Sequence, residues 1–491
     1  MADRSFRHIL IAGVFFGLVF LAMLAWRLGV FENRPDSTLH APLAGDAAQK
    51  ETWMNVYQND RRIGYSHSVF QRTETGYSLR ENVFLRLNTM GLTQDLEMGT
   101  SARLLPDMTL DAFDFRIASG AFRFSATGRI VDQAIRITTD SGNPGRTVDI
   151  PIQERPSLSA VLIPGLAARN LREGEHLRFS IFDPTAMAMQ PVVVQVAAEE
   201  TISHRGQIVT ARKLILQYRE TNQTAWIDAQ GNVLREEGLL GLRLENTSRE
   251  DALSDIPREG GRDLTLAAAV PSNVHIEAPA GLETLSVRIG GVHLEGQTLG
   301  DGRQSYSNGL LQIRKEFLGD IPDRLPEEAL PEEARALLSP SLFIQSDHPR
   351  FRKLIGEIVS PEDAVLIRIS KIVSWIRQHV EKRPALSIPD ALATLENRVG
   401  DCNEHAVLFA ALARAAGIPA RVEAGLVYLN DRFYYHAWNG VYVGRWITVD
   451  PLFGQFPADV THLRFATGEQ NLQAVLISLL GRVTIRVEAM D

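Results

Sequence analysis

The hydrophobic and polar positions divide the chain into three parts with different periods. Residues 9–26 are uncharged and mostly apolar, residues 52–250 alternate in short segments, and helical spacing of apolar residues becomes clear only after residue 360. A period of two is typical of strands with one buried face, and a spacing of three and four is typical of an amphipathic helix. The pattern predicts an α+β protein in which antiparallel β-rich domains precede a mixed C-terminal domain.

The apolar run near the N-terminus is long enough to cross a membrane. At a rise of about 1.5 Å per residue its 18 residues are close to the minimum for a bilayer core, and residues 28–31 can extend it. A cleaved secretory signal usually has a shorter apolar region of about 7–15 residues, although Ala-Pro-Leu-Ala at 41–44 leaves cleavage open. We therefore expect one transmembrane helix over residues 9–28, preceded by a short tail over residues 1–8.

The charges beside this run predict its orientation. Arg4, Arg7 and the terminal amine precede it, whereas Arg27 and Arg34 follow it. Because positive charge is retained on the cytoplasmic side, this narrow excess places the N-terminus in the cytoplasm. The large C-terminal part is then expected outside the cytoplasmic membrane, in the periplasm or another extracytoplasmic space.

A linker and a β-rich domain are expected to follow. Residues 29–50 are polar and lack periodicity, as is typical of a linker, and the β-rich domain is expected over residues 51–255. Within it, alternating segments are broken by Gly, Asn and Asp, which favours antiparallel strands with one wet face. Its histidines are isolated from other candidate catalytic residues and are expected to be surface or sheet-packing residues: His67, His176 and His204.

A smaller β domain is expected over residues 256–320. Two short alternating segments flank Gly290-Gly291, which predicts a two-residue hairpin at that point. Residues 321–340 are rich in Pro and Glu and are expected to be a linker. The last domain is expected over residues 341–480, where helical periodicity and the only cysteine of the chain both occur.

The first helix of this last domain is predicted to begin at Ser360-Pro361-Glu362-Asp363. A hydroxyl N-cap, a proline at the first helical position and acid in the first turn are all start signals. The buried stripe of this helix is expected to consist of apolar residues at helical spacing: Ile369, Ile372, Val373, Ile376 and Val380.

The single cysteine, Cys402, excludes an intrachain disulfide and a cluster of thiolate ligands. By frequency alone, such a residue is a small buried hydrophobe. Here Asp401 is followed three residues later by Glu404, a capping-box pattern that predicts a helix over 402–415 with Cys402 at its first position. The unpaired N–H groups and the positive dipole end of a helix N-terminus favour a thiolate, so Cys402 is predicted to be a reactive nucleophile.

A base and its carboxylate partner follow on a predicted hairpin. Side chains alternate faces along strands, so residues that face each other across a hairpin mirror its centre. The midpoint between His436 and Asp450 is residue 443, beside Gly444, where a three-residue turn with a left-handed glycine fits. His436 and Asp450 are therefore expected directly opposite each other, or one diagonal apart, on the same face. The three strands of this region are expected at 422–428, 433–443 and 446–450.

Two other interpretations of these residues remain open. One is that His436 is a satisfied histidine in an aromatic cluster with Trp438, which otherwise is expected to shield the catalytic pair from water. The other is a zinc site formed by Cys402, His405, His436 and Asp450, which is weaker because no second cysteine is present. Outside that zinc site, His405 is expected to be a helix-packing or exposed polar residue, or to support Cys402 from one turn away.

Several motifs together carry a resemblance to a known family. They are Gly-Asp-Cys-Asn-Glu-His-Ala around Cys402, Leu-Ala-Arg-Ala-Ala-Gly-Ile-Pro-Ala-Arg at 412–421, Tyr-His-Ala-Trp around His436, and Trp-Ile-Thr-Val-Asp-Pro ending just after Asp450. Over roughly residues 340–470 the chain resembles the bacterial transglutaminase-like superfamily, in its membrane-anchored type. The resemblance implies a papain-like core with a Cys-His-Asp triad, whose members match Cys402, His436 and Asp450.

These observations predict a membrane-anchored cysteine acyl transferase, or an amide or peptide hydrolase, that acts on a protein or peptide through a thioester on Cys402. The backbone N–H of Cys402 is a natural donor to the oxyanion. The alternative is a non-catalytic envelope scaffold or peptide-binding protein that uses a transglutaminase-like domain. Neither a cofactor nor a metal is expected. The net charge of −8 and the isoelectric point near 5.9 argue against a nucleic-acid partner.

Overall fold

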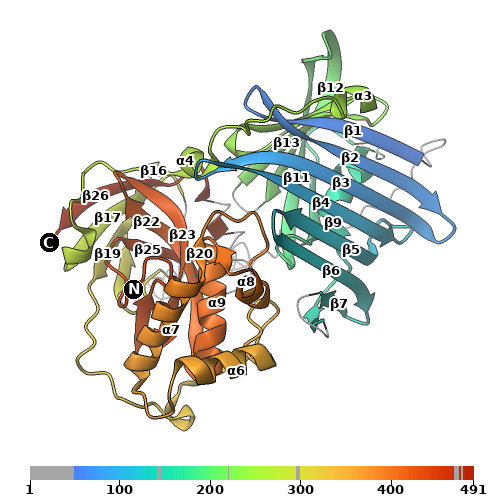
Figure 1. Ribbon diagram of the computed structural model, residues 1–491. Helices are drawn as coiled ribbons and strands as arrows, with labels where there is room; N and C mark the ends of the chain where they lie inside the picture. The colour runs from blue at the N-terminus through green and yellow to red at the C-terminus, as the bar shows by residue number, and fades with distance from the viewer. Residues whose placement is uncertain are drawn as a thin grey trace, which may run out of the picture.

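The computed structural model describes residues 49–140, 145–167, 169, 171–218, 221–292, 294, 299–468, 475–476 and 479–491. These residues form a large β-sheet and a mixed C-terminal unit that lie side by side (Figure 1). The predicted tail and transmembrane helix, residues 1–28, lie outside the described residues, as does the predicted linker except for its last two residues. In the described part of the chain, no helix is both long and apolar enough to span a bilayer.

The large sheet contains 15 strands within the described residues. Its order is β8-β7-β6-β5-β4-β3-β2-β1-β15-β14-β13-β12-β11-β10-β9, so two meanders meet where β1 pairs with β15. All pairs are antiparallel except β9 with β10, which confirms the predicted antiparallel architecture. The strands are β1 (Gln49–Gln58), β2 (Arg61–Thr73), β3 (Gly76–Thr89), β4 (Leu92–Leu104), β5 (Leu110–Ser119), β6 (Phe122–Val131), β7 (Ala134–Thr139), β8 (Thr147–Pro151), β9 (Ser157–Leu158), β10 (His176–Asp183), β11 (Ala188–His204), β12 (Gln207–Tyr218), β13 (Thr221–Ile227), β14 (Val233–Glu237) and β15 (Leu242–Thr247).

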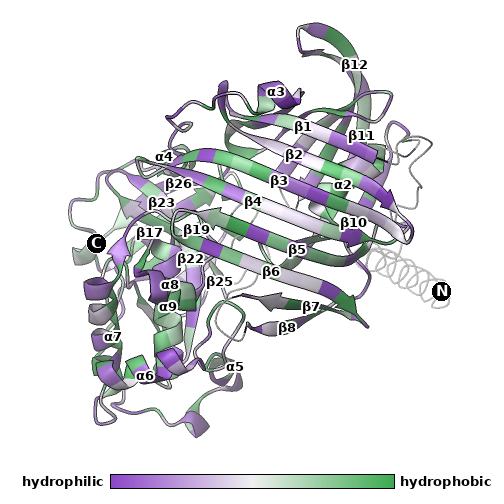
Figure 2. Cartoon of the chain, turned by 45° about the vertical axis from the view of Figure 1, so that its right-hand side comes forward, coloured by the Kyte–Doolittle hydropathy of each residue, from purple (hydrophilic) through white to green (hydrophobic). Residues whose placement is uncertain are grey.

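Alternating residues give this sheet one buried face. In β6, for example, Phe122, Phe124 and Ala126 are buried while Arg123 and Thr127 are exposed. Figure 2 shows hydrophobic and hydrophilic colours following one another along such strands. The buried face packs on α2 (Ser159–Ala167), which is apolar on nearly all sides and is enclosed in the same core. A helix that is hydrophobic all round is expected to be buried in this way.

The isolated histidines of the sheet lie where the sequence analysis expected them. The ring of His67 stacks on Trp53 at 3.9 Å between centroids, and its Nε2 atom lies 2.9 Å from Glu51. His176 is exposed and His204 is partly exposed. All three are surface or sheet-packing residues.

A second sheet contains β17 (Thr284–Gly290), β18 (Gln304–Ser307), β19 (Leu310–Arg314) and β26 (Thr484–Met490), in the order β18-β19-β17-β26. The hairpin predicted at Gly290-Gly291 is wrong, because β17 pairs with β19 and with β26, almost 200 residues further along the chain. At Gly291 a Cβ atom would lie 2.0 Å from the carbonyl oxygen of Arg482. This glycine therefore permits a close approach to the start of β26 rather than a tight turn.

The C-terminal unit places helices on one face of a third sheet. The sheet order is β16-β23-β22-β25, with β24 paired to β23. The helix α9 packs against β22, β23 and the neighbouring helices (Figure 1), and the other face of this sheet packs on the β17 sheet. Its main elements are α6 (Pro349–Ile358), α7 (Val365–His379), α8 (Ala391–Asn397), α9 (Cys402–Ala415), β16 (Val270–Pro271), β22 (Ala420–Leu429), β23 (Arg432–Tyr442), β24 (Trp446–Val449) and β25 (His462–Thr467).

Short elements connect these units. They are η1 (Leu239–Gly241), α3 (Arg249–Ala252), α4 (Leu264–Ala268), η2 (Pro279–Gly281), η3 (Glu327–Ala329), α5 (Glu332–Ala336), β20 (Glu381–Lys382) and β21 (Val399–Gly400). Two of them lie in residues 321–340, which the sequence analysis expected to be a linker. This stretch is packed rather than free, because Leu330 and Ala334 are buried and Arg414 of α9 donates to the carbonyl of Ser339 at 2.9 Å.

The predicted start of α7 at Pro361 is wrong by four residues. The sequence from Ser360 forms a turn in which Asp363 accepts a hydrogen bond from the Ser360 amide at 2.7 Å. The same carboxylate accepts from Lys371 at 2.6 Å, so these polar side chains close a turn ahead of the helix instead of capping it. The predicted buried stripe is confirmed, since all five of its residues have at most 5% of their surface exposed.

Residues 384–388 join the C-terminal unit to the large sheet. Gln94 of β4 donates to the carbonyl of Pro384 at 3.2 Å. Leu386 packs with the cluster around Leu87 and Leu96, and Ile388 belongs to the main core of the large sheet. The two units therefore share an apolar contact through this segment.

A glycine beside the C-terminal hairpin provides a test of this packing. Gly425 of β22 pairs with His436, and a Cβ atom there would lie 1.9 Å from the carbonyl oxygen of Leu463. Replacing Gly425 by alanine must push β25 away from β22, so we expect Gly425→Ala to destabilise the C-terminal unit by at least about 2 kcal/mol. Thermal unfolding followed by tryptophan fluorescence measures this loss.

The matched control is Gly356→Ala. Gly356 is exposed on α6, and a Cβ atom there would meet no other atom within 4 Å. This variant should be stabilised by up to about 1 kcal/mol, because alanine is the better helix former. Equal effects of the two substitutions would contradict the packing of β25 on β22.

Candidate active site

Cys402 begins α9, as its capping box predicted. The Asp401 carboxylate accepts from the Asn403 amide at 2.9 Å, and the Glu404 carboxylate accepts from the Asp401 amide at 2.9 Å. Glu404 is buried and also accepts from Ser387 at 2.6 Å. The helix start is thus held from both sides, and Cys402 has a fixed place at the first helical position.

The sulfur of Cys402 lies against the strand that carries His436. The backbone N–H of Ala437, the residue after His436, hydrogen-bonds this sulfur. Only 9% of the Cys402 surface is exposed. Burial and the neighbouring charge of Asp401 raise the pKa of the Cys402 thiol well above its ordinary value, whereas the Ala437 amide lowers it.

This environment corrects one expectation from the sequence. The helix N-terminus was expected to favour the thiolate, but burial and nearby carboxylates dominate. Burial thus favours the thiol form of Cys402, and nucleophilic attack by that form requires a base that accepts the proton.

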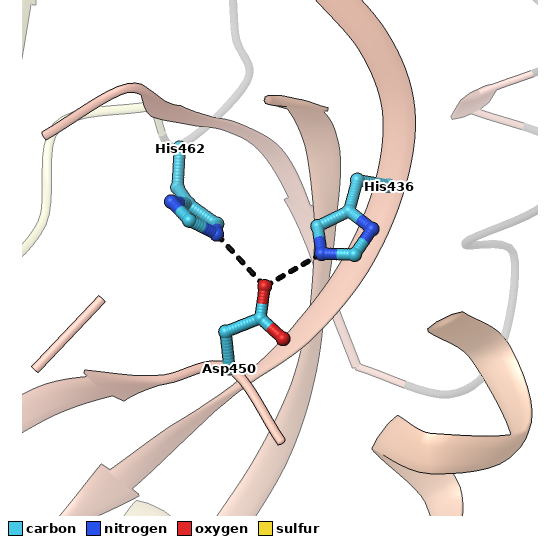
Figure 3. A group of neighbouring side chains, drawn as sticks. All are labelled: His436, Asp450 and His462. Carbon is cyan, nitrogen blue, oxygen red and sulfur yellow. Dashed lines mark hydrogen bonds and ion pairs between the residues drawn. The ribbon is translucent and has the colours of Figure 1, made fainter. Parts of the chain in front are cut away.

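His436 directly precedes Ala437, whose backbone N–H bonds the Cys402 sulfur. The His436 ring is oriented by Asp450. The His436 Nε2 atom lies 2.7 Å from Asp450 Oδ2 (Figure 3). Its imidazole stacks on Phe453 at 4.9 Å between centroids and lies beside Trp438. Because Nε2 is engaged by the carboxylate, Nδ1 is the nitrogen that remains, and in the described part of the chain it has no hydrogen-bond partner.

The hairpin geometry follows the predicted parity. Strands β23 and β24 are joined by residues 443–445, with Gly444 at a φ of 94°. The register pairs Asn439 with Val449, which sets His436 and Asp450 one diagonal apart rather than directly opposite. The prediction that these two side chains meet is confirmed by their hydrogen bond.

Asp450 is fully buried, and both of its carboxylate oxygens have hydrogen-bond partners. Its Oδ2 atom faces both His436 Nε2 and His462 Nε2, the latter at 2.9 Å, and its Oδ1 atom accepts from the Phe453 amide at 2.8 Å. Burial alone would raise the pKa of Asp450, but the two histidines hold it well below its ordinary range. The contacts with both histidines therefore favour the ionised form of Asp450.

His462 of β25 is a site residue that the sequence analysis missed. It is fully buried and approaches Asp450 from the side opposite His436 (Figure 3). Its Nδ1 atom lies 3.3 Å from the carboxylate of Asp459. Burial opposes the charged form, yet hydrogen bonds to Asp450 and Asp459 raise the pKa of His462 above its ordinary value. In the sequence, the feature that could have drawn attention to His462 is Asp459, a carboxylate three residues earlier that contacts its Nδ1 atom.

Trp438 packs beside both histidines of the site. It is fully buried, its ring meets His462 edge-on at 5.2 Å, and its indole N–H donates to Glu423 at 3.0 Å. Arg421 and Arg464 flank the other oxygen of Glu423. Trp438 thus contributes to an apolar wall around both histidines, in line with the predicted shielding role.

The zinc site proposed as an alternative is not assembled. His405 is buried, and its Nδ1 atom lies 2.7 Å from the Asp401 carbonyl oxygen, while its Nε2 atom has no partner within the described residues. Among those residues, His436, Asp450 and His462 form the one group of three or more potential metal ligands whose atoms all lie within 4.8 Å of one another, and neither Cys402 nor His405 joins it. Both histidines of that group direct Nε2 to Asp450, which favours a hydrogen-bonded group over a ligand set.

Comparison with known proteins supports a family for this domain. Residues 352–451 match the transglutaminase-like superfamily model, which is about a fifth of the chain and includes Cys402, His436 and Asp450. The chain therefore contains a transglutaminase-like domain. No curated protein matches the sequence significantly.

Three solved structures are similar to parts of the chain. A candidate cysteine protease from Cytophaga hutchinsonii is 22% identical over 42% of this chain and 86% of that chain, with a TM-score of 0.29. A β-barrel-like protein of a domain of unknown function from Brucella abortus is 10% identical over 41% and 95%, with a TM-score of 0.31. The periplasmic domain of TgpA from Pseudomonas aeruginosa, bound to ethylmercury, is 17% identical over 36% and 92%, with a TM-score of 0.22. At such scores these likenesses add nothing to the family match.

The charge of His462 gives a pH-dependent prediction. Because its folded-state pKa is raised, His462 contributes stability that is fully present below the unfolded value of about 6.5 and is lost as the pH rises through the folded value. Glutamine can still donate one hydrogen bond to Asp450 but carries no charge. We expect His462→Gln to lower the melting temperature most below pH 6.5, by an amount that corresponds to about 1–3 kcal/mol, and progressively less at higher pH.

The control for this series is His176→Gln, at an exposed histidine of β10. This substitution should leave the melting temperature unchanged from pH 5.5 to pH 9. A loss in His462→Gln that is the same at every pH would contradict a charged histidine between two carboxylates.

Proposed function

We propose that this protein is a membrane-anchored, cysteine-dependent acyl transferase or amide hydrolase that forms a thioester on Cys402. The observation that carries the proposal is the joint placement of three groups. Cys402 contacts the residue next to His436, and His436 in turn is oriented by the buried carboxylate of Asp450. The match to the transglutaminase-like superfamily supports this papain-like chemistry.

In the first step, His436 acts as the base. As the Cys402 sulfur attacks a peptide or carboxamide carbonyl, Nδ1 of His436 takes the thiol proton, and the carbonyl oxygen becomes an oxyanion. The Cys402 backbone N–H at the start of α9 has no partner within the helix, which supports it as the donor to this oxyanion. Asp450 stabilises the imidazolium that forms, since its carboxylate stays ionised.

In the second step, His436 acts as the acid and then again as the base. Its proton goes to the leaving amine as the C–N bond breaks, which leaves the acyl group on Cys402 as a thioester. Water, or an incoming amine, then attacks the thioester while His436 accepts its proton. As the C–S bond breaks, His436 returns this proton to the Cys402 sulfur, which restores the thiol, and the product is the carboxylic acid or the new amide. We favour water as the acceptor, since an amine would need a dedicated site.

The second candidate function is a peptide-binding scaffold without turnover, and the closed site favours it. Only 9% of Cys402 and 5% of His436 are exposed, and Phe453 stacks on the His436 ring. So small an exposed surface leaves little room for a substrate carbonyl beside the sulfur, and a scaffold without turnover does not need that access.

An isotope experiment distinguishes the two functions. Peptides that contain glutamine are incubated with the full-length protein in heavy-oxygen water, and hydrolysis is measured as incorporation of heavy oxygen into new carboxylates. Cys402→Ala should abolish incorporation, because the thioester cannot form. Asp450→Asn should lower the rate by about a hundredfold or more, because the imidazole loses its orientation and its counter-charge.

The control is Asp255→Asn, at an exposed aspartate outside the C-terminal unit. Its rate should equal that of the unmodified protein, and both inactive variants should unfold at a melting temperature that shows an intact fold. Undiminished incorporation in Cys402→Ala would disprove the proposed nucleophile. Absence of incorporation in the unmodified protein would favour the scaffold.

The proposed anchor and orientation have a separate test. Because Cys402 is buried, the probe is a new cysteine at Ile208, which is 81% exposed, in a chain that also carries Cys402→Ala. A membrane-impermeant maleimide added to spheroplasts should label Ile208→Cys without lysis. The matched variant Ser5→Cys, in the tail ahead of residues 9–28, should be labelled only after lysis. The reverse pattern would place the large part of the chain in the cytoplasm.

A further inference from the structure

The large sheet encloses a cavity that the proposed acyl transfer does not use. Its volume is about 470 Å³, within the range of about 300–1,000 Å³ that is typical of small-molecule sites. Strands β1, β2, β3, β12, β13, β14 and β15, the helix α2 and residues 229–231 form its walls. All of its lining residues precede residue 245, so the cavity belongs to the β-rich part of the chain and not to the transglutaminase-like domain.

Part of the cavity lining is apolar. Met54, Phe70, Leu79 and Ile163 are buried residues of the main core that also line the cavity, and Leu244 packs against the same core. Phe70 of β2 and Leu79 of β3 are paired directly beside the Ser68–Glu81 pair, whereas Met54 lies on the other side of that pair. Phe70 and Leu79 form an apolar surface against which a hydrocarbon portion of a ligand can pack.

Two carboxyl groups also line the cavity. They belong to Glu81 of β3 and Glu236 of β14. Burial raises the pKa of each to about 7, and the charge of Glu81 also raises the pKa of Glu236. Glu236 accepts from Gln223 at 2.9 Å, whereas Glu81 has no hydrogen-bond or ion-pair partner among the described residues.

Among the described residues that line the cavity, Lys50 is the only lysine, arginine or histidine. Its ammonium donates to the Gly231 carbonyl at 2.5 Å, and the charge of Asp228 also acts on it. This cation is thus directed to the loop at residues 228–231, and within the described residues neither Glu81 nor Glu236 has an ion-pair partner.

We propose that this cavity binds a small organic amine. Its ammonium group lies between Glu81 and Glu236, and its apolar body lies against Phe70 and Leu79. A neutral apolar ligand would leave the carboxyls without partners, and an anion would be repelled by them, whereas an ammonium supplies both hydrogen bonds and the missing charge. The hydroxyl of Ser68 lines the same volume and can accept a further hydrogen bond.

Isothermal titration of the full-length protein with three six-carbon probes tests the charge requirement. The probes are hexylamine, 1-hexanol and hexanoate, which share the same chain and differ in the charge of the head group. Hexylamine should bind saturably, 1-hexanol at least about tenfold more weakly, and hexanoate not at all. Binding of 1-hexanol or hexanoate as tight as that of hexylamine, or no binding of hexylamine, would overturn the proposal.

The titratable groups around the cavity also predict a pH dependence. They are Lys50, Glu81, Tyr218 and Glu236, and burial raises the pKa of Tyr218 so that its hydroxyl stays neutral. The amine binds the ionised carboxyls, whose pKa is about 7 in the empty cavity. The affinity for hexylamine should therefore fall about tenfold between pH 8 and pH 6 for each carboxyl that must ionise. Binding at pH 7 should release protons, measured as a binding heat that depends on the buffer, and an affinity independent of pH would contradict the assignment.

Two substitutions locate the binding to this cavity. Glu81→Gln keeps the shape of the side chain but removes its charge, and it should weaken hexylamine binding at least about tenfold. The matched control, Glu97→Gln, changes an exposed glutamate of the neighbouring strand β4 and should bind hexylamine like the unmodified protein. Unchanged melting temperatures show that both variants are folded. Unaltered binding by Glu81→Gln would place the amine elsewhere.

Discussion

The buried carboxylate of Asp450 is the group on which the rest of the C-terminal unit depends. An ion without contact with solvent costs several kcal/mol in desolvation, and it persists only if its lone pairs are satisfied. Here two imidazoles and the Phe453 amide supply those hydrogen bonds. Because the histidines come from β23 and β25, which lie on either side of β22, the carboxylate links two strands that are not paired with each other. The same bonds that offset its desolvation also orient the ring of His436.

Much of this site follows from local sequence patterns. The capping box at Asp401 and Glu404 predicted the first residue of α9, and the parity of residues around Gly444 predicted that His436 and Asp450 meet. Both predictions rest on short-range backbone geometry, which a few neighbouring residues determine. The start of α7 shows the limit of such signals, because the side chain of Asp363 closed a turn instead of beginning a helix.

Contacts between distant segments could not be derived in the same way. His462 reaches Asp450 only because β25 pairs with β22, and β26 joins β17 across almost 200 residues. The two glutamates line one cavity only because the pairing of β1 with β15 brings the two meanders together. None of these three pairings leaves a periodic signal in the sequence. The acidity of Cys402 was misjudged for a related reason, since its burial is produced by the whole domain and not by the helix end alone.

The central claim is that Cys402 attacks carbonyl groups with His436 as its base. The most direct measurement is the intact mass of the protein after mixing with p-nitrophenyl acetate, a small activated ester, followed by peptide mapping. The claim predicts one acetyl group on Cys402 at neutral pH, and a much slower acetylation of the same residue in His436→Gln. Acetylation of other residues only, or an equal rate in the His436 variant, would contradict it.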